Sequence, residues 1–267
     1  MAPEGFVESA FTYGGVTYPI FRRGTGPGVV IMPEIPGFTP KTADLGRRVS
    51  DSGFTVVVPS LFGTPGKGFS LPYVGQQFIR VCISREFHVL ASNHSSPIAD
   101  WLRALCRQVH AELGGPGVGV LGLCLTGNFA LSLMVDPVVL APVMSEPALP
   151  FPVSPSRKRG IHLSQDELSK VKERVRDGVC VLGLRFTQDM LCPAQRFSTL
   201  RQELGDGFEG IEIDSGPGNP HHIRKLAHSV LTEEFVDQEG HPTREALDRV
   251  TAFFQQRLIA PASAASG

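Results

Sequence analysis

The sequence predicts an α/β protein, in which a mostly parallel, twisted sheet is covered by helices on both faces. Short apolar runs alternate along the chain with longer runs whose apolar residues recur at helical spacing. The apolar runs have the length of strands that are buried on both faces. The chain has 267 residues, 42% of them hydrophobic, which is enough for one core. We therefore expect a single domain over residues 1–258.

The apolar runs place the strands of this sheet. Six segments are expected to form them: Gly28–Met32, Thr55–Val58, Gly117–Leu121, Val138–Val143, Val179–Leu184 and Gly210–Ile213. Helices are expected over residues 98–113, 164–178 and 243–258. The first of these carries Cys106 on its apolar face, and the second begins with a capping box formed by Ser164 and Glu167.

Two segments fit neither pattern. Residues 60–97 mix glycine, proline and aromatic residues, and residues 145–160 contain four prolines followed by SRKRG. Long loops of this kind often form lids or binding loops. We expect the basic SRKRG run to be a solvated loop, with an anion-binding lid as the alternative. The tail, residues 259–267, is expected to be disordered.

Composition excludes several classes of protein. The 25 basic and 26 acidic residues give a net charge of −1 without a basic stripe, so nucleic acid is not an expected partner. No apolar run reaches the roughly 18 residues of a membrane span, and the N-terminus lacks a signal-peptide core. Five widely spaced cysteines indicate neither a disulfide framework nor a zinc site. We expect a cytoplasmic protein without metal or cofactor, either monomeric or homodimeric.

The segment VGVLGLCLTGNFAL, residues 118–131, passes from a strand-like run into a helix-like run through Cys124. Gly122 and Gly127 leave the space that a sharp turn displaying a nucleophile requires. The N–H groups at the start of the helix would favour the thiolate, and the N–H of Leu125 is placed to bind an oxyanion. The alternative is a cysteine that only packs in the core. We interpret Cys124 as a nucleophile.

An acid and a histidine follow the cysteine in a meaningful order. Asp189 comes directly after the strand VCVLGLRF, and the long loop after the next strand contains His221, His222 and His228. The order nucleophile, acid, histidine is that of the α/β hydrolases. Asp189 has an alternative role as the cap of the following helix. His221 competes with His228 as the base, and His222 is interpreted as a loop residue.

These motifs resemble the dienelactone hydrolase family, a branch of the α/β-hydrolase fold with a Cys-His-Asp triad. The resemblance covers about residues 10–258 and rests on GLCLTG, on VVIMPEIPGFTP followed by TVVVPSLFG, on TQDMLCPAQRF and on AHSVLT. It implies that Cys124 is the nucleophile, Asp189 the acid and His228 the base. Thr126 stands where the family usually has a second glycine.

The resemblance also assigns roles to Glu34 and Ile35, which follow the strand Gly28–Met32. It implies that Glu34 contacts the resting thiol until substrate displaces it, and that the N–H of Ile35 is the second oxyanion donor. An anionic neighbour would keep Cys124 protonated and protect it from oxidation. The alternative for Glu34 is a solvated residue at the end of a strand.

The resemblance is incomplete where the family binds the carboxylate of its substrate. One of the arginines used there corresponds to Thr232, Arg85 is the candidate for the other, and Arg224 is a further candidate. We expect a cofactor-free hydrolase of small esters or lactones. The alternatives are a non-catalytic ligand-binding protein on the same fold and a redox-sensing thiol protein, although no resolving cysteine lies near Cys124 in the sequence.

Overall fold

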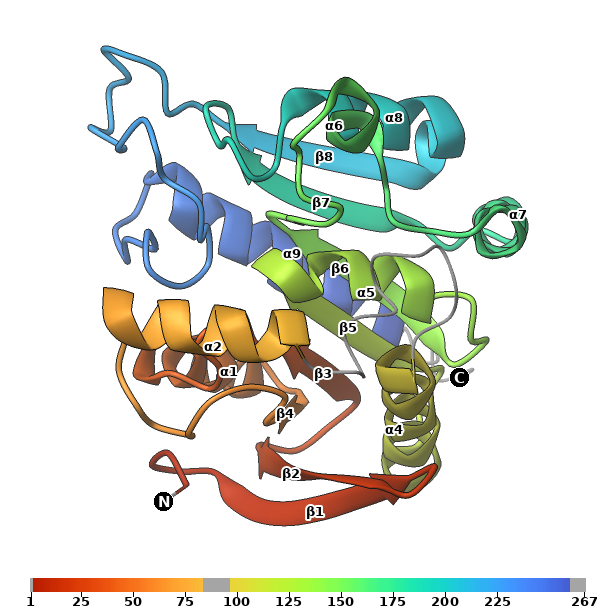
Figure 1. The fold of residues 1–267 in the computed structure, drawn as a ribbon. Coiled ribbons are helices and arrows are strands. Elements are labelled where there is room, and N and C mark those ends of the chain that lie inside the picture. The colour runs from red at the N-terminus through yellow and green to blue at the C-terminus, as the bar shows by residue number, and fades with distance from the viewer. Residues whose placement is uncertain (1, 84–96, 260–267) are drawn as a thin grey trace, which may run out of the picture.

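The computed structural model describes residues 2–83 and 97–259, and this part of the chain forms one eight-stranded sheet (Figure 1). The strands are β1 (Val7–Tyr13), β2 (Val16–Arg23), β3 (Gly28–Met32), β4 (Thr55–Pro59), β5 (Val118–Leu123), β6 (Val139–Ser145), β7 (Val181–Phe186) and β8 (Phe208–Ile213). Their order across the sheet is β1-β2-β4-β3-β5-β6-β7-β8. β1 and β2 pair antiparallel, as do β2 and β4, and all other pairs are parallel. The predicted fold class and all six predicted strands are confirmed.

Helices cover both faces of this sheet (Figure 1). They are α1 (Pro40–Asp51), α2 (Leu71–Ile83), α4 (Pro97–Leu113), α5 (Gly127–Leu133), α6 (Pro155–Arg159), α7 (Gln165–Arg176), α8 (Ala194–Leu204) and α9 (Pro242–Leu258), with short 3-10 turns η2 (Cys124–Thr126) and η3 (Gly205–Gly207). Apolar residues of α1 and α9 share one core cluster, and those of α4, α5, α7 and α8 share the other. Successive residues of β3 alternate between the two clusters, as the period of a strand requires. The three predicted helices are confirmed, and Cys106 is fully buried as expected.

The prediction that residues 60–97 and 145–160 form only irregular loops was wrong. The first segment contains α2 and the second contains the short helix α6. In both helices a proline, Pro72 or Pro155, occupies the first turn, where a missing N–H costs no intrahelical bond. Residues 84–96 and the tail beyond Ile259 lie outside the described part. No helix in that part is long and apolar enough to cross a membrane.

The carboxyl ends of the parallel strands lie at one edge of the sheet. Glu34 follows β3, Cys124 follows β5, Glu146 follows β6 and Asp189 follows β7. The loop after β8, residues 214–241, carries the three histidines considered above. Functional side chains of open α/β sheets gather at this edge.

Candidate active site

Cys124 lies at a strained turn between β5 and α5. Its φ is 52°, a left-handed conformation that costs a non-glycine residue about 1–2 kcal/mol. The hydroxyl of Thr126 accepts the N–H of Leu123 at 2.9 Å and donates to the Met32 carbonyl at 2.7 Å. The N–H of Ala148 donates to the Cys124 carbonyl at 3.0 Å. Thr126, at a position where the family usually has glycine, therefore ties the turn to β3.

The glycine spacing of the turn has the steric cause expected from the sequence. A Cβ at Gly122 would lie 2.2 Å from the Thr126 carbonyl oxygen. A Cβ at Gly127 would lie 2.8 Å from the Cα of Pro147 and 2.9 Å from the Ser145 carbonyl oxygen. These neighbours are backbone atoms, so no side-chain rotation could relieve either clash.

His228 and Asp189 meet at the carboxyl edge of the sheet. The Nδ1 of His228 lies 2.7 Å from the Oδ2 of Asp189, and the Oδ1 of Asp189 accepts the N–H of Leu191 at 2.8 Å. Helix α8 begins at Ala194 with Pro193 as its N-cap. The alternative that Asp189 caps this helix was therefore wrong, since its carboxylate binds the histidine and its own loop.

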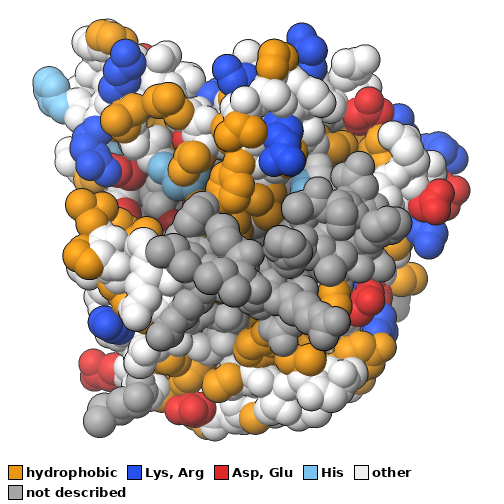
Figure 2. All heavy atoms as spheres, in the orientation of Figure 1, with side chains coloured by type: hydrophobic (Ala, Val, Ile, Leu, Met, Phe, Trp, Pro, Cys, Tyr) orange, Lys and Arg blue, Asp and Glu red, His pale blue; other side chains and the backbone are white. Residues whose placement is uncertain are grey.

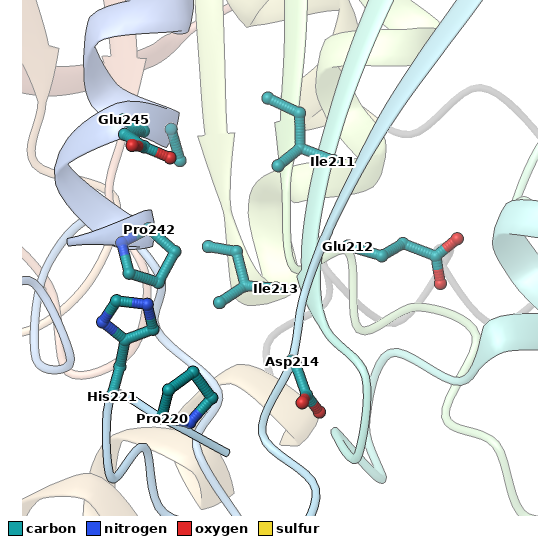
Figure 3. Close-up of a pocket in the computed structure, with 9 residues that line it drawn as sticks. Ile211, Glu212, Ile213, Asp214, Pro220, His221, Pro242 and Glu245 are labelled. Atoms are coloured by element: carbon teal, nitrogen blue, oxygen red, sulfur yellow. The ribbon is translucent and has the colours of Figure 1, made fainter. Parts of the chain in front are cut away.

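The other two histidines of the loop lie elsewhere. His221 packs edge-on against His241, with ring centroids 5.2 Å apart. It lines a hollow of about 490 Å³ formed by β8 and the start of α9, whose lining residues include neither His228 nor Asp189 (Figure 3). His222 is exposed and has a positive φ. Of the three, His228 is the one that binds Asp189.

A buried arginine fixes the loop that carries Asp189. The guanidinium of Arg185 donates to the carbonyl of Thr187 at 2.9 Å and to that of Cys192 at 2.8 Å, one on each side of Asp189. It also pairs with Glu212 at 2.5 Å. Because one rigid, planar group holds both ends of the loop, the Asp189 carboxylate has a defined position.

Cys124 and His228 shift each other's protonation. Burial raises the pKa of the Cys124 thiol, His228 opposes this rise, and Glu34 and Glu146 add to it. Burial lowers the pKa of His228, but the charges of Cys124 and Asp189 and their hydrogen bonds outweigh this effect and raise it well above its usual value. The Nε2 of His228 is buried and has no partner of normal hydrogen-bond geometry among the described residues. With Nδ1 bound to Asp189, Nε2 is the ring nitrogen left to exchange a proton with Cys124.

Glu34 is buried beside this group, not solvated at the strand end. The hydroxyl of Ser229 donates to its Oε2 at 2.5 Å, and the hydroxyl of Thr232 donates to its Oε1. Thr232, at the position that the resemblance assigns to an arginine, thus gives Glu34 a neutral partner. Glu34 is also close enough to raise the pKa of Cys124.

Glu146 was missed in the sequence, although it directly follows β6, which extends two residues beyond the predicted strand Val138–Val143. It is fully buried, its φ is 36°, and its Oε2 accepts the Ser145 hydroxyl at 2.5 Å and the N–H of Val230 at 3.2 Å. The signal that could have revealed it is its place, since a carboxyl after a central strand lies at the same edge as Cys124 and Asp189.

The segment that follows Glu146 is held by a second buried arginine, Arg196. Its guanidinium donates to five carbonyl groups, those of Pro147, Pro150, Arg157, Gly160 and Leu191. Burial lowers the pKa of Arg196. The basic side chains of the SRKRG run are exposed, in agreement with the expectation that this run is solvated. We call this arrangement of Arg196 and its five carbonyls the Arg196 clamp.

The structure describes one of the two arginines that were candidates for binding a substrate carboxylate. Arg85 lies outside the described residues. Arg224 is largely exposed and forms an ion pair with Glu234. Large hydrophobic side chains are exposed on the segments that follow the carboxyl ends of the strands: Phe69, Leu71 at the start of α2, Val153, Met190, Leu191 and Leu226. Figure 2 shows hydrophobic side chains in the upper middle and the lower part of the face seen in Figure 1, with charged side chains among and around them.

A strained cysteine at a strand-helix turn, with a histidine and an aspartate from the next loops of a mostly parallel sheet, defines an α/β hydrolase. The model of the dienelactone hydrolase family matches residues 17–258. The chain therefore belongs to the dienelactone hydrolase family, a family of ester and lactone hydrolases. No curated protein sequence matches it significantly.

Solved structures of similar proteins agree with this fold. A Klebsiella pneumoniae subsp. pneumoniae protein classed as a dienelactone hydrolase is 18% identical, with a TM-score of 0.63 over 94% of this chain and 98% of its own. The dienelactone hydrolase from Anabaena variabilis is 14% identical, with a TM-score of 0.60 over 96% and 100%. A cold-adapted esterase from an Arctic intertidal metagenomic library is 14% identical, with a TM-score of 0.59 over 97% of each chain. At these identities the likeness establishes the fold alone.

Proposed function

We propose that the protein hydrolyses esters or lactones of small molecules through a Cys-His-Asp triad and a covalent thioester. The observation that carries this proposal is the 2.7 Å bond between His228 Nδ1 and Asp189 Oδ2 at the sheet edge where Cys124 is displayed. Asp189 fixes the ring so that the proton is on Nδ1 and Nε2 is the base. The proposal needs no metal or cofactor.

In the first half of the reaction, Nε2 of His228 takes the thiol proton as Cys124 attacks the substrate carbonyl. The N–H groups of Leu125 and Ile35 bind the oxyanion of the tetrahedral intermediate. Collapse of this intermediate forms the thioester, and the imidazolium gives its proton to the leaving oxygen. Burial keeps the resting thiol protonated, so the thiolate forms mainly when substrate is present.

In the second half, His228 removes a proton from water as the water attacks the thioester. The thiolate leaves, and the imidazolium returns its proton to Cys124. The tetrahedral intermediate of the first half can also expel the thiolate, which returns the substrate unchanged. Substrates with poor leaving groups are therefore disfavoured. Activated aryl esters, enol lactones and thioesters are the substrates that suit this chemistry.

The surroundings of the site favour neutral, apolar acyl or alcohol groups. Hydrophobic side chains are exposed on the loops at the carboxyl edge, and the Thr232 position carries no charge for a substrate carboxylate. The described cysteines, Cys106, Cys124, Cys180 and Cys192, are all free, which suits the reducing cytoplasm.

The test is intact-mass spectrometry after brief exposure to activated aryl esters and enol lactones. We expect one acyl adduct or turnover in the wild type and neither in Cys124→Ala. The matched control is Cys180→Ala, because Cys180 is also a partly exposed free thiol. Full activity in Cys124→Ala would exclude the proposed nucleophile.

The same measurement separates the two rival functions. A ligand-binding protein would give neither adduct nor turnover with any ester of the panel. A redox-sensing protein would gain one or more oxygen atoms at Cys124 with peroxide and no acyl group with esters.

A further inference from the structure

A third carboxyl group lies next to the triad, and the proposed mechanism does not use it. Glu146 is fully buried, and its backbone N–H donates to the Leu184 carbonyl at 2.8 Å. Its left-handed φ of 36° costs energy for a glutamate. Its Oε2 receives two hydrogen bonds, one of them from Val230, whereas its Oε1 has no partner among the described residues.

The three buried carboxyls of the site differ in their hydrogen-bond partners. Both oxygens of Asp189 and both oxygens of Glu34 have donors. Glu146 has donors on one oxygen only. A buried carboxylate spreads its charge over both oxygens, so an oxygen without a donor strongly disfavours ionisation. A neutral acid fits the observed pattern better than a carboxylate, with Oε2 as the carbonyl oxygen that accepts two bonds, because a buried hydroxyl without an acceptor costs less than a buried charge.

The charges around Glu146 point the same way. The titratable groups that act on it or respond to it are Glu34 after β3, Cys124 after β5, His228 after β8 and Cys192 before α8. Burial and Glu34 raise the pKa of Glu146 to about 8, against the opposing effect of His228. The buried guanidinium of Arg196 donates to backbone carbonyls and does not pair with Glu146.

We propose that Glu146 is a positioning residue of the triad that works as a neutral carboxylic acid, holding the Val230 N–H and thereby the loop that presents His228. Val230 lies two residues after His228, so this bond fixes the backbone next to the base. The proposal rests on the proposed function of Cys124 and His228. It also explains why a third carboxyl is tolerated here, because a neutral acid does not oppose formation of the thiolate.

Ionisation of Glu146 would disturb the site from two directions. A negative charge there would raise the pKa of Cys124 further and would favour the imidazolium form of His228. Fewer molecules would then carry the neutral imidazole that takes the thiol proton in the proposed mechanism. Activity should therefore fall on the alkaline side of its pH profile as Glu146 loses its proton.

The protonation state can be tested without any substrate. Infrared difference spectra between about pH 6 and about pH 10 detect the carbonyl stretch of a carboxylic acid that ionises in this range. We expect this band in the wild type and in the control Glu173→Gln, an exposed glutamate on α7. We expect its loss in Glu146→Gln. A spectrum of the wild type identical to that of Glu146→Gln would overturn the neutral carboxyl.

The positioning role is tested with two variants and two readouts. Glu146→Leu removes the acceptor of the Val230 N–H and should lower kcat by about tenfold or more with little change in KM. Glu146→Gln keeps an uncharged acceptor and should restore kcat, with an alkaline limit shifted to higher pH than in the wild type. A Leu variant as active as the Gln variant, or an unchanged alkaline limit in Glu146→Gln, would overturn the proposal.

Failure of the proposed function would be recognised separately. If no ester is turned over by the wild type, the rate of Cys124 alkylation by iodoacetamide replaces kcat in the same series. It reports the coupling of Cys124 and His228 without turnover. We expect slower alkylation at neutral pH in Glu146→Leu than in Glu146→Gln, and equal rates would again overturn the positioning role.

Discussion

Replacing Asp189 with asparagine should remove most of the activity without unfolding the protein. Asp189 accepts the Leu191 N–H on Oδ1 and the Nδ1 proton of His228 on Oδ2. An asparagine has one carbonyl oxygen, and the backbone N–H of Leu191 can only donate. The amide oxygen will therefore stay with Leu191, and the NH₂ group will face His228.

The NH₂ group that faces His228 in this variant determines how much activity is lost. An NH₂ group facing Nδ1 requires that nitrogen to be an acceptor, which moves the ring proton to Nε2. A protonated Nε2 cannot accept the thiol proton of Cys124. In serine triads the wrong tautomer lowers the rate about 10⁴-fold, and we expect a loss of roughly 10³- to 10⁴-fold in kcat/KM, or about 4–5 kcal/mol. The charge-assisted bond contributes only about 1.5–3 kcal/mol to stability.

The assay is kcat/KM for an aryl acetate, together with a thermal unfolding curve. Asp206→Asn is the matched control, since Asp206 is exposed on η3. The control should keep wild-type activity. If Asp189→Asn retained more than about a tenth of wild-type kcat/KM, with the bond to His228 removed, the reasoning about the tautomer would be refuted.

Three further substitutions test the packing and pH dependence of the fold. Gly127→Ala should lower the free energy of unfolding by about 2–3 kcal/mol, because its Cβ would meet the backbone at Pro147, whereas Gly75→Ala, where the space is open, should not. Arg196→Lys should cost about 3 kcal/mol in a denaturant titration, since three ammonium hydrogens cannot satisfy five carbonyls; a loss below about 1 kcal/mol would contradict the clamp. Burial lowers the pKa of His162 to about 4, so the unfolded chain binds this proton first as the pH falls below about 6.5. Stability from this group is complete above that pH and should fall by up to about 3 kcal/mol by pH 4. His162→Asn should reduce this slope because asparagine does not titrate, and asparagine also tolerates the positive φ of this position.

The sequence was sufficient for the parallel part of the sheet and for the order of the site residues. Short continuous apolar runs such as Gly28–Met32 are typical of a strand buried on both faces. Asp189 and His228 could be placed because parallel strands bring their carboxyl ends to one edge. Choosing His228 over His221 needed matching flanks, and the bond to Asp189 now gives this choice a geometric basis.

The sequence was not sufficient where a residue's surroundings come from distant segments. β1 is mostly exposed, so it has no apolar run, and only the Gly14-Gly15 pair with its two positive φ angles signals the hairpin that it forms with β2. The proton of Glu146 depends on Glu34, on the Val230 N–H and on complete burial, none of which is local to it. Burial of a polar group can be read from a sequence only when a motif accompanies it.

The Arg196 clamp has a consequence for how this enzyme could be altered. It recognises four carbonyl groups between Pro147 and Gly160, and a carbonyl is common to every amino acid. Much of the path of the segment is therefore determined outside the segment, by one side chain of α8. Exposed residues of the segment, such as Val153, can therefore be substituted while the segment keeps its path. Libraries of substitutions at these positions, on an unchanged Arg196, are a direct route to variants with different substrate preferences.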